Sequence, residues 1–354
     1  MITHRLHGSE IFIGEKALSL IPDWLGSHVK AKRLFVLVDD QTEHSCLPIF
    51  TSAMQGRYEV IKIAIPAGER NKTLELCAYV WNRLLDHKAV KSDVLVTLGG
   101  GMITDLGGLA ASLYKRGMRF IHVPTSLMGM TDAAIGGKTA VDFNNIKNAI
   151  GLFSSPKAIF IDPIFLKTLP HREIANGWAE VVKHALIADI SIWEELPADA
   201  SAIPDFDLLL RSIAVKVLVV QEDFEEKGRR KILNFGHTVG HAIETIHLES
   251  RNVLLHGEAI VWGMLIETEI AKQLKLILDD EAQQIQDKLL SFFDPDPLKT
   301  MNSDQLLHFL LQDKKNERNT ILFSLISDIG NCTWNCEVDQ EIILSAVKKF
   351  ISLQ

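Results

Sequence analysis

Two histidines stand four residues apart in the segment 234–241, and a third follows at position 256. A spacing of four places His237 and His241 on one face of a helix. A catalytic zinc site needs three His or carboxylate ligands and an open position, and Glu180, in a helical stretch, is a candidate for the oxygen ligand. No Glu follows His237 directly, so the zinc-protease motif is absent. A single histidine is more often a capped or core residue, but two histidines at helical spacing with a third, His256, beside Gly257 favour a metal site.

A glycine turn follows the apolar run Val94–Leu98, where Gly99, Gly100 and Gly101 precede a helical pattern. A strand, a glycine turn and a helix N-terminus form a common phosphate site, because free backbone N–H groups point at the ligand. Thr104 occupies the sixth position, so the spacing is not the usual dinucleotide fingerprint. A tight turn without a ligand explains this motif equally well. The loop 66–73 has a similar character, and by itself it indicates a turn and a helix cap.

A second glycine loop, 132–139, carries Gly136, Gly137 and Lys138. It resembles the end of a nucleotide-binding P-loop, but Asp132 replaces that motif's first glycine, which disfavours nucleotide triphosphate hydrolysis. What remains is a flexible loop that presents Lys138 and, further on, Lys147 and Asn148 to an anionic, hydroxylated ligand. For two lysines alone, a solvated surface is the simpler interpretation.

The composition is that of a folded protein: 354 residues, 47% hydrophobic, and a net charge of −8 from 37 Lys and Arg against 45 Asp and Glu. An acidic balance argues against a nucleic-acid partner. Four scattered cysteines do not form a disulfide framework. The N-terminus does not resemble a signal peptide, and no apolar run approaches the ~18 residues of a membrane-spanning helix. We therefore expect a cytoplasmic protein without a membrane partner.

The elements that must position these residues change in character along the chain. Strand-like apolar runs alternate with helical patterns in the first half, which predicts a parallel sheet with helices on both faces. The expected strands are Leu34–Val38, Tyr58–Ile65, Val94–Leu98, Phe120–Val123 and Ala158–Ile161, and the expected helices between them include Thr73–His87 and Asp105–Lys115. After about Pro170 helical periodicity dominates. The expected helices there are Arg172–Asp189, Ala202–Glu222, 237–249, Glu258–Leu274 and Glu281–Phe293, with one strand-like stretch, 319–327. We expect an α/β domain over 1–172 and a helical domain over 173–354.

An ordered set of motifs spans about residues 30 to 325. It comprises PAGER (66–70), GGGMITD (99–105), YKRG (114–117), PTSL (124–127), DAAIGGKT (132–139), KN (147–148), FLKTLP (165–170), AEVVKH (179–184), LNFGHTVGH (233–241), LHGE (255–258) and DKK (313–315). No single motif is decisive, but the ordered set is specific. The sequence resembles the 3-dehydroquinate synthase family of the sugar phosphate cyclase superfamily.

The resemblance implies a fold and cofactors. The fold would be an N-terminal α/β, Rossmann-like NAD-binding domain built on a parallel sheet and an all-α C-terminal metal-binding domain. Zn²⁺ or Co²⁺ would be bound by Glu180, His237 and His256. The residues implied for NAD are Asp40, Ala67, Gly68, Glu69, Arg70, Asn71, Lys72, Gly101, Met102, Ile103, Thr104, Asp105, Thr125, Ser126, Lys138, Lys147, Phe165, Leu166, Lys167 and Thr168.

The resemblance also implies a small anionic sugar phosphate as substrate, met by many basic groups. The implied substrate residues are Arg116, Asp132, Lys138, Asn148, Lys183, Lys216, Arg230, Asn234, His241 and one of Lys314 or Lys315, of which we take Lys314. Arg116 would come from the neighbouring subunit of a homodimer. The implied catalytic residues are His241, Lys183, Asn234 and Lys138, with His241 the candidate for proton handling.

The implied reaction converts 3-deoxy-D-arabino-heptulosonate 7-phosphate to 3-dehydroquinate and phosphate. It proceeds by transient oxidation with NAD, β-elimination of phosphate, reduction, ring opening and an aldol closure, as the second step of the shikimate pathway to chorismate and the aromatic amino acids. Such an enzyme is a phosphorus–oxygen lyase that regenerates its NAD in each turnover. Two other enzymes remain open: a sister cyclase with a different sugar phosphate, and a metal-dependent polyol dehydrogenase, which would accumulate NADH. A regulatory protein that has lost activity is disfavoured, because the metal, lysine and arginine positions are all filled.

Overall fold

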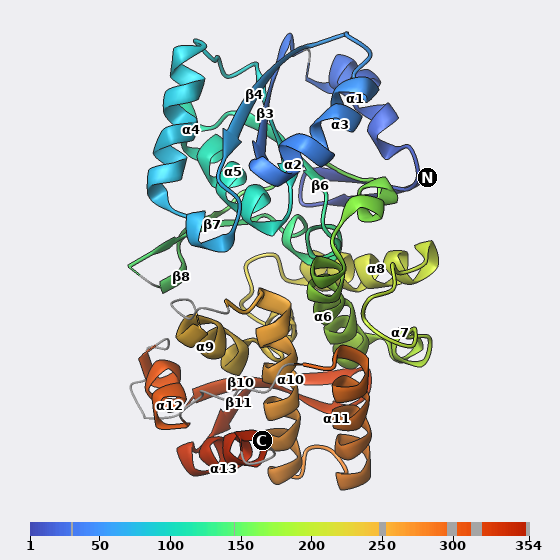
Figure 1. The fold of residues 1–354 in the computed structure, drawn as a ribbon, viewed down its shortest axis with the longest axis vertical. Helices are drawn as coiled ribbons and strands as arrows, with labels where there is room; N and C mark the ends of the chain where they lie inside the picture. The colour runs from blue at the N-terminus through green and yellow to red at the C-terminus, as the bar shows by residue number, and fades with distance from the viewer. Residues whose placement is uncertain (30, 145, 248–252, 296–302, 313–320, 352–354) are drawn as a thin grey trace. The chain divides into compact units, whose positions relative to one another are not determined.

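The computed structural model describes residues 1–29, 31–144, 146–247, 253–295, 303–312 and 321–351 (Figure 1). Within it the chain forms two compact units, Met1–Glu173 and Ile174–Gln354. In the described part of the chain, no helix is both long enough and apolar enough to cross a bilayer.

The first unit is built on a seven-stranded sheet in the order β1-β2-β9-β6-β5-β3-β4. Its strands, with those of a separate hairpin β7–β8, are β1 (Ile2–Leu6), β2 (Ser9–Ile13), β3 (Arg33–Asp39), β4 (Glu59–Ile65), β5 (Val94–Gly99), β6 (Arg119–Pro124), β7 (Lys138–Phe143), β8 (Ile146–Phe153) and β9 (Ala158–Ile161). All neighbours in the sheet pair in parallel except β1 with β2. The five strands expected from the sequence are present, and the parallel α/β prediction is confirmed.

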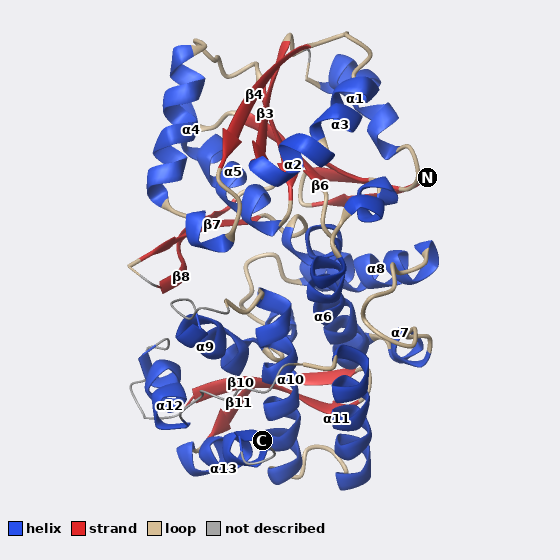
Figure 2. Ribbon diagram, in the orientation of Figure 1, coloured by secondary structure: helices blue, strands red, loops and turns tan. Residues whose placement is uncertain are grey.

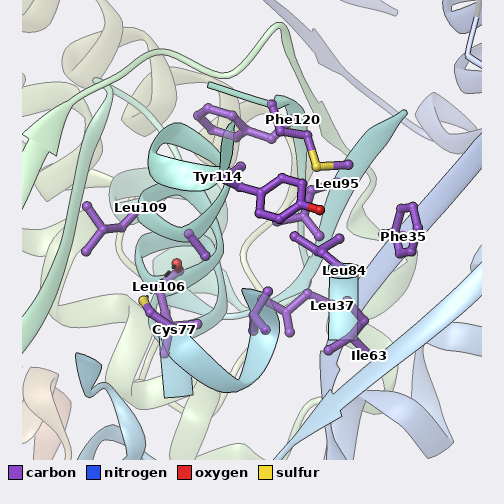
Figure 3. Close-up of a cluster of buried hydrophobic side chains, with 14 of the residues drawn as sticks. Phe35, Leu37, Ile63, Cys77, Leu84, Leu95, Leu106, Leu109, Tyr114 and Phe120 are labelled. Atoms are coloured by element: carbon purple, nitrogen blue, oxygen red, sulfur yellow. Dashed lines mark hydrogen bonds between the residues drawn. The ribbon is translucent and has the colours of Figure 1, made fainter. Parts of the chain in front are cut away.

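Helices cover both faces of this sheet. They are α1 (Ile21–His28), α2 (Asp40–Ser45), α3 (Leu47–Ala53), α4 (Leu74–Asp86) and α5 (Gly101–Leu113). Figure 1 shows α4 and α5 on one side of β3 and β4, with α1 and α3 on the other. Apolar side chains of α4 and α5 meet those of the strands in one buried cluster, which includes Leu37, Leu84, Leu95 and Leu106 (Figure 3). Continuous apolar strands therefore bury both faces, as parallel strands do.

The second unit is mostly helical, as the sequence predicts (Figure 2). Its helices are α6 (His171–Ala188), which starts at the end of the first unit, α7 (Ile190–Glu194), α8 (Phe206–Glu222), α9 (His237–His247), α10 (His256–Gln273), α11 (Asp279–Phe293), α12 (Ser303–Gln312) and α13 (Gln340–Ile351). Nearly every residue of α10 from Gly257 to Ala271 is buried, which makes it the central helix of this unit.

The expectation of an all-α second unit needs one addition. Strands β10 (Ile321–Asp328) and β11 (Asn331–Val338) pair in an antiparallel hairpin. The strand-like stretch 319–327 anticipates β10, whereas β11 is not anticipated, because its residues Asn331–Cys336 are polar or only half-buried and show no clear alternation. The helix expected from Asp105 also begins earlier, at Gly101, directly after the glycine turn.

Candidate active site

Three helices of the second unit bring the predicted metal ligands together. Glu180 lies on α6 with 1% of its side chain exposed, His237 is the first residue of α9, and His256 is the first residue of α10. The Nε2 atoms of His237 and His256 each lie 3.5 Å from Oε1 of Glu180. Two predicted ligands that lie 57 and 76 positions after Glu180 in the sequence thus converge on one of its carboxylate oxygens.

His241 completes a group of three imidazoles. Its ring centroid lies 5.1 Å from that of His237 and 5.6 Å from that of His256. One ring nitrogen of each of the three histidines lies within 4.8 Å of the others. Two nitrogen ligands and a carboxylate oxygen form a donor set that Zn²⁺ and Co²⁺ accept, and His241 stands next to it.

Hydrogen bonds at Nδ1 orient the rings of both predicted ligand histidines. Nδ1 of His237 lies 3.2 Å from the carbonyl oxygen of Phe235, and Nδ1 of His256 lies 3.3 Å from Oε2 of the buried Glu244. When Nδ1 carries the proton, Nε2 keeps its lone pair for a metal. Both Nε2 atoms face Glu180, so each ring is oriented as a metal ligand needs to be.

Charged groups around Glu180 shift the pKa values of His237 and His256 in opposite directions. Burial and the ammonium of Lys183 hold the pKa of His237 well below its usual value, so this imidazole is neutral. Burial alone would lower the pKa of His256, but Glu244 and Glu180 outweigh it and raise that pKa to about 9. Lys183, itself 1% exposed, forms an ion pair with Oε2 of Glu180. Buried carboxylates that attract cationic groups this strongly are suited to a divalent cation.

Glycines leave the room that these helices need to approach so closely. The chain turns into α9 at Gly236, whose φ of +77° favours glycine, and a Cβ there would lie 2.6 Å from Cγ of Met264. A Cβ on Gly257 would lie 2.1 Å from the carbonyl oxygen of Asn176, and one on Gly263 would lie 1.8 Å from that of Gly236. Glycine is therefore required where α9 and α10, and α10 and α6, touch.

The polar residues predicted to meet substrate in this unit form a second group. Lys216 on α8 and Arg230 in the short 3₁₀ helix Arg229–Asn234 are both buried. Asn234 donates a hydrogen bond of 2.7 Å to Oε1 of Glu226, whose other oxygen lies 4.0 Å from Nε of Arg230. Glu226 is not among the residues predicted from the sequence, although it joins two predicted site residues. Lys314 and Lys315 lie outside the described residues.

In the first unit, the predicted NAD residues gather at one edge of the sheet. Five of the predicted segments each follow the carboxyl end of a parallel strand. Asp40 follows β3, the 67–72 loop follows β4, Gly101–Asp105 follows β5, Thr125–Ser126 follows β6, and 165–168 follows β9. Carboxyl ends of parallel strands share an edge, which is where α/β sheets bind ligands. Contacts between these loops agree: Oδ1 of Asp40 accepts from the N–H of Ala67 at 2.9 Å, and the carbonyl oxygen of Gly99 accepts from the N–H of Thr125 at 3.0 Å.

The glycine turn opens α5 without a side-chain cap. The N-cap residue is Gly100, which has no side chain to accept a hydrogen bond from the first N–H groups of the helix. A Cβ on Gly99 would lie 2.6 Å from Ile103, and one on Gly100 would lie 3.1 Å from Oγ of Ser126. The turn therefore exposes helix N–H groups close to a hydroxyl, an arrangement that can receive a phosphate. The side chains of Ile103, Phe165 and Leu166 are buried, so only their backbones are available to a ligand.

A charge network links the predicted NAD and substrate residues of this unit. Nζ of the buried Lys72 lies 2.7 Å from Oδ2 of Asp105 and 2.7 Å from Oδ1 of Asn148, and 3.4 Å from Glu69. Lys147 lies 3.5 Å from the same Glu69 carboxylate. Burial alone would lower the pKa of Lys72, but Asp105 and Glu69 outweigh it and raise it, so the ammonium persists.

Three further predicted site residues of the first unit lie on other segments. Lys138 starts β7 and is exposed, and Asp132 is half-buried in the short helical segment Gly129–Ala133. Arg116 is exposed in the turn between α5 and β6, with a φ of +62°. Because β6 begins at Arg119, this turn lies at the amino end of the parallel strands. Within one chain, Arg116 therefore stands at the edge opposite the predicted NAD residues.

Comparison with known proteins identifies relatives over nearly the whole chain. The family described as 3-dehydroquinate synthase N-terminal matches residues 62–176, and 3-dehydroquinate synthase C-terminal matches 177–316. The 3-dehydroquinate synthase of Parabacteroides distasonis is 35% identical over 342 residues, 96% of either chain.

Solved structures show the same fold. One of 2-deoxy-scyllo-inosose synthase with carbaglucose-6-phosphate, NAD⁺ and Co²⁺ has a TM-score of 0.88 at 24% identity, covering 99% of this chain and 100% of its own. One of 2-epi-5-epi-valiolone synthase from Streptomyces hygroscopicus, with NAD⁺ and Zn²⁺ bound, has a TM-score of 0.85 at 26% identity, covering 100% and 99%. From the two family matches and the extent of identity to a curated relative, this chain belongs to the 3-dehydroquinate synthase family.

Proposed function

We propose that this protein converts 3-deoxy-D-arabino-heptulosonate 7-phosphate to 3-dehydroquinate and phosphate, in the cytoplasm, as the second step of the shikimate pathway. The observation that carries the proposal is the convergence of His237 and His256 on the buried Glu180, in a chain that belongs to this family. The basic groups of both units suit a substrate with a carboxylate, a phosphate and several hydroxyls.

Glu180, His237 and His256 would hold Zn²⁺ or Co²⁺. The fit rests on the donor set, on the neutral state of His237, and on the two Nδ1 hydrogen bonds that turn both Nε2 atoms toward Glu180. When bound, such an ion coordinates neighbouring substrate hydroxyls and lowers the pKa of the one to be oxidised. The 2-epi-5-epi-valiolone synthase structure with NAD⁺ and Zn²⁺ supports this cofactor pair in the same fold.

The carboxyl edge of the parallel sheet would hold NAD. The uncapped start of α5 at Gly101 offers N–H groups to the pyrophosphate, with the Ser126 hydroxyl nearby. Bound NAD⁺ supplies reversible hydride transfer and is regenerated in each turnover. Lys72 stays charged between Asp105 and Glu69, and together with Lys147 it offsets the negative charge of these carboxylates at this edge.

The remaining polar residues would bind substrate and move protons. In the second unit, Lys216 and Arg230 would meet the anionic groups of the substrate, and Lys183 and Asn234 would bind its hydroxyls. In the first unit Asp132, Lys138 and Asn148 would contribute. His241 lies beside the metal ligands and would accept or donate protons during oxidation and elimination.

Arg116 would act on the substrate of a neighbouring subunit. Its position at the amino edge of the sheet, opposite the predicted NAD loops, supports a homodimer that shares this residue. Mixing two inactive variants, R116A and H256A, tests this. Random heterodimers restore one intact site in half of the dimers, so activity should return to about a quarter of the wild-type value. If R116A is fully active alone, the shared role is wrong.

The decisive assay measures phosphate release from the heptulosonate phosphate with catalytic NAD⁺, with and without a chelator, while NADH absorbance is followed. We expect chelator-sensitive phosphate release without lasting NADH. Lasting NADH would instead indicate a polyol dehydrogenase. Activity only on other sugar phosphates would indicate a sister cyclase.

The proton role of His241 is tested separately with H241N. His247 is on the same helix and its Nδ1 lies 2.9 Å from the carbonyl oxygen of Ile243, so H247N is a matched control. We expect H241N to lose most turnover while it keeps its bound metal, and H247N to keep both. An H241N enzyme that retains most of its turnover would contradict the assignment, and one that loses its metal would make His241 a ligand instead.

A further inference from the structure

A fully buried carboxylate on α10 holds the start of α9. The side chain of Glu267 has no exposed surface. Its Oε2 accepts a hydrogen bond of 2.6 Å from the N–H of Gly236, and its Oε1 accepts one of 2.9 Å from the N–H of Val239. These two N–H groups flank His237, the first residue of α9.

This carboxylate, which belongs to α10, caps the N-terminus of α9. The first N–H groups of a helix lack intrahelical partners, and burying them unpaired is costly. Gly236, which precedes α9, has no side chain that could cap it. A carboxylate at a helix N-terminus also interacts favourably with the helix dipole, and its hydrogen bonds are charge-assisted. Glu267 therefore determines where α9 starts.

The same helix carries a proposed metal ligand. His256 and Glu267 are eleven residues apart on α10, which is about three turns, so both lie on the same side of that helix. Between them, Gly263 allows α10 to contact the backbone of Gly236 directly. One rigid helix thus bears His256 at one end and, three turns later, the group that fixes the backbone of His237.

We infer that Glu267 is a positioning residue of the metal site: it sets His237 relative to His256 and thereby preforms the pair of nitrogen ligands. The inference rests on the proposed function only through the metal, which is the ion that the ligand pair would bind. Glu267 itself faces the backbone of α9, and its action on a metal is transmitted through His237.

The test is Co²⁺ binding by the full-length protein after metal removal, measured as a dissociation constant and as the visible absorption spectrum, which reports ligand geometry. E267Q keeps the size of the side chain but replaces one acceptor oxygen by an NH₂ group that faces a backbone N–H. E269Q is the matched control. Glu269 is also buried on α10, but it binds Lys349 at 2.7 Å and Gln286 at 3.2 Å, on α13 and α11 instead of α9.

We expect E267Q to bind Co²⁺ about 10–100-fold more weakly with an altered spectrum, as for residues that orient metal ligands. E269Q should melt at a lower temperature yet keep wild-type affinity and spectrum. If E267Q does not fold, E267D replaces it, because its shorter carboxylate must draw the start of α9 toward α10 or lose a hydrogen bond. The same loss of affinity is expected.

Two results would overturn the inference while leaving the proposed function intact: wild-type Co²⁺ affinity and spectrum in the folded Glu267 variant, or an equal loss of affinity in E269Q, which would reveal general loosening. Wild-type protein that binds no Co²⁺ would overturn the proposed metal site and this inference together. Phosphate release at saturating Co²⁺ further distinguishes the positioning role of Glu267 from the proton role of His241. A positioning residue permits partial rescue by metal, whereas the loss caused by H241N persists.

Discussion

Replacing Gly263 by alanine tests the contact between α9 and α10. A Cβ at this position would lie 1.8 Å from the carbonyl oxygen of Gly236, whereas ordinary contacts begin at 3.4 Å. The two backbones must therefore separate by about 1.6 Å, and no flexible side chain can absorb this change. Overpacking costs about 1–3 kcal/mol where side chains can adjust. With backbone against backbone we expect about 3 kcal/mol or more, even after the gain in helix propensity of about 1 kcal/mol from Gly to Ala.

The assay is thermal unfolding monitored by tryptophan fluorescence, because Trp178, Trp193 and Trp262 lie in the second unit, which contains α9 and α10. For a unit of this size, 3 kcal/mol corresponds to a fall in Tm of about 6–12 °C. Gly26 in α1 provides the control, since a Cβ there would meet only Oη of Tyr58 at 3.8 Å. G26A should stabilise the first unit by about 0.5–1 kcal/mol. A G263A protein as stable as wild type would refute the tight crossing of α9 and α10.

Three further predictions test other parts of the structure. E244Q removes the charged partner of His256 Nδ1, so Co²⁺ should bind about 10–100-fold more weakly in a metal titration. Burial lowers the pKa of His122 to about 3, so only the unfolded chain takes up its proton as the pH falls below about 6.5. Protonation of the unfolded chain therefore lowers the free energy of unfolding as the pH falls from neutral toward 3. Urea unfolding should show a loss of about 2 kcal/mol between pH 6.5 and 5 that H122N lacks. K72M leaves the Asp105 carboxylate without its buried partner and should cost about 3–5 kcal/mol in thermal unfolding, partly recovered by D105N.

The parallel sheet could be predicted because its strands are long, apolar and buried on both faces. Val94–Leu98, for example, is apolar except for Thr97 and is fully buried. The elements that were missed lack such a signal. β2 has only five residues at the N-terminal side of the sheet, and β8 is mostly exposed along its length. The β7–β8 hairpin was also not predicted, because the glycines before it and the asparagines within it suggest a ligand-binding loop.

The site could be predicted in part, for a similar reason. His237 and His241 are four residues apart and share a helix, so local spacing reveals them. Glu180 lies 57 residues before His237, so its residue type and helical context made it only a candidate, and the resemblance to a family is what pairs it with the histidines. Glu244 lies seven residues after His237, two helical turns along the same face, and this spacing was a usable signal for the partner of His256.

Glu267 could not be found in this way, because its partners are backbone N–H groups of another helix and no side-chain pattern records them. The same holds for Asn176 on α6, whose Oδ1 accepts a hydrogen bond of 2.6 Å from the N–H of Gly257, at the start of α10. Such contacts depend on where helices cross. Helix crossings follow from packing across the whole unit and not from local sequence.

Together, these contacts join the three helices that carry the proposed ligands. Asn176 on the helix of Glu180 caps the helix of His256, Glu267 on the helix of His256 caps the helix of His237, and Glu244 on the helix of His237 binds the His256 ring. His237 and His256 are therefore each positioned by a side chain from another proposed ligand's helix. A site organised in this way is set before an ion arrives, because its geometry is maintained by hydrogen bonds within the protein. Changes at these positions should weaken metal binding although none of the three groups is among the proposed ligands.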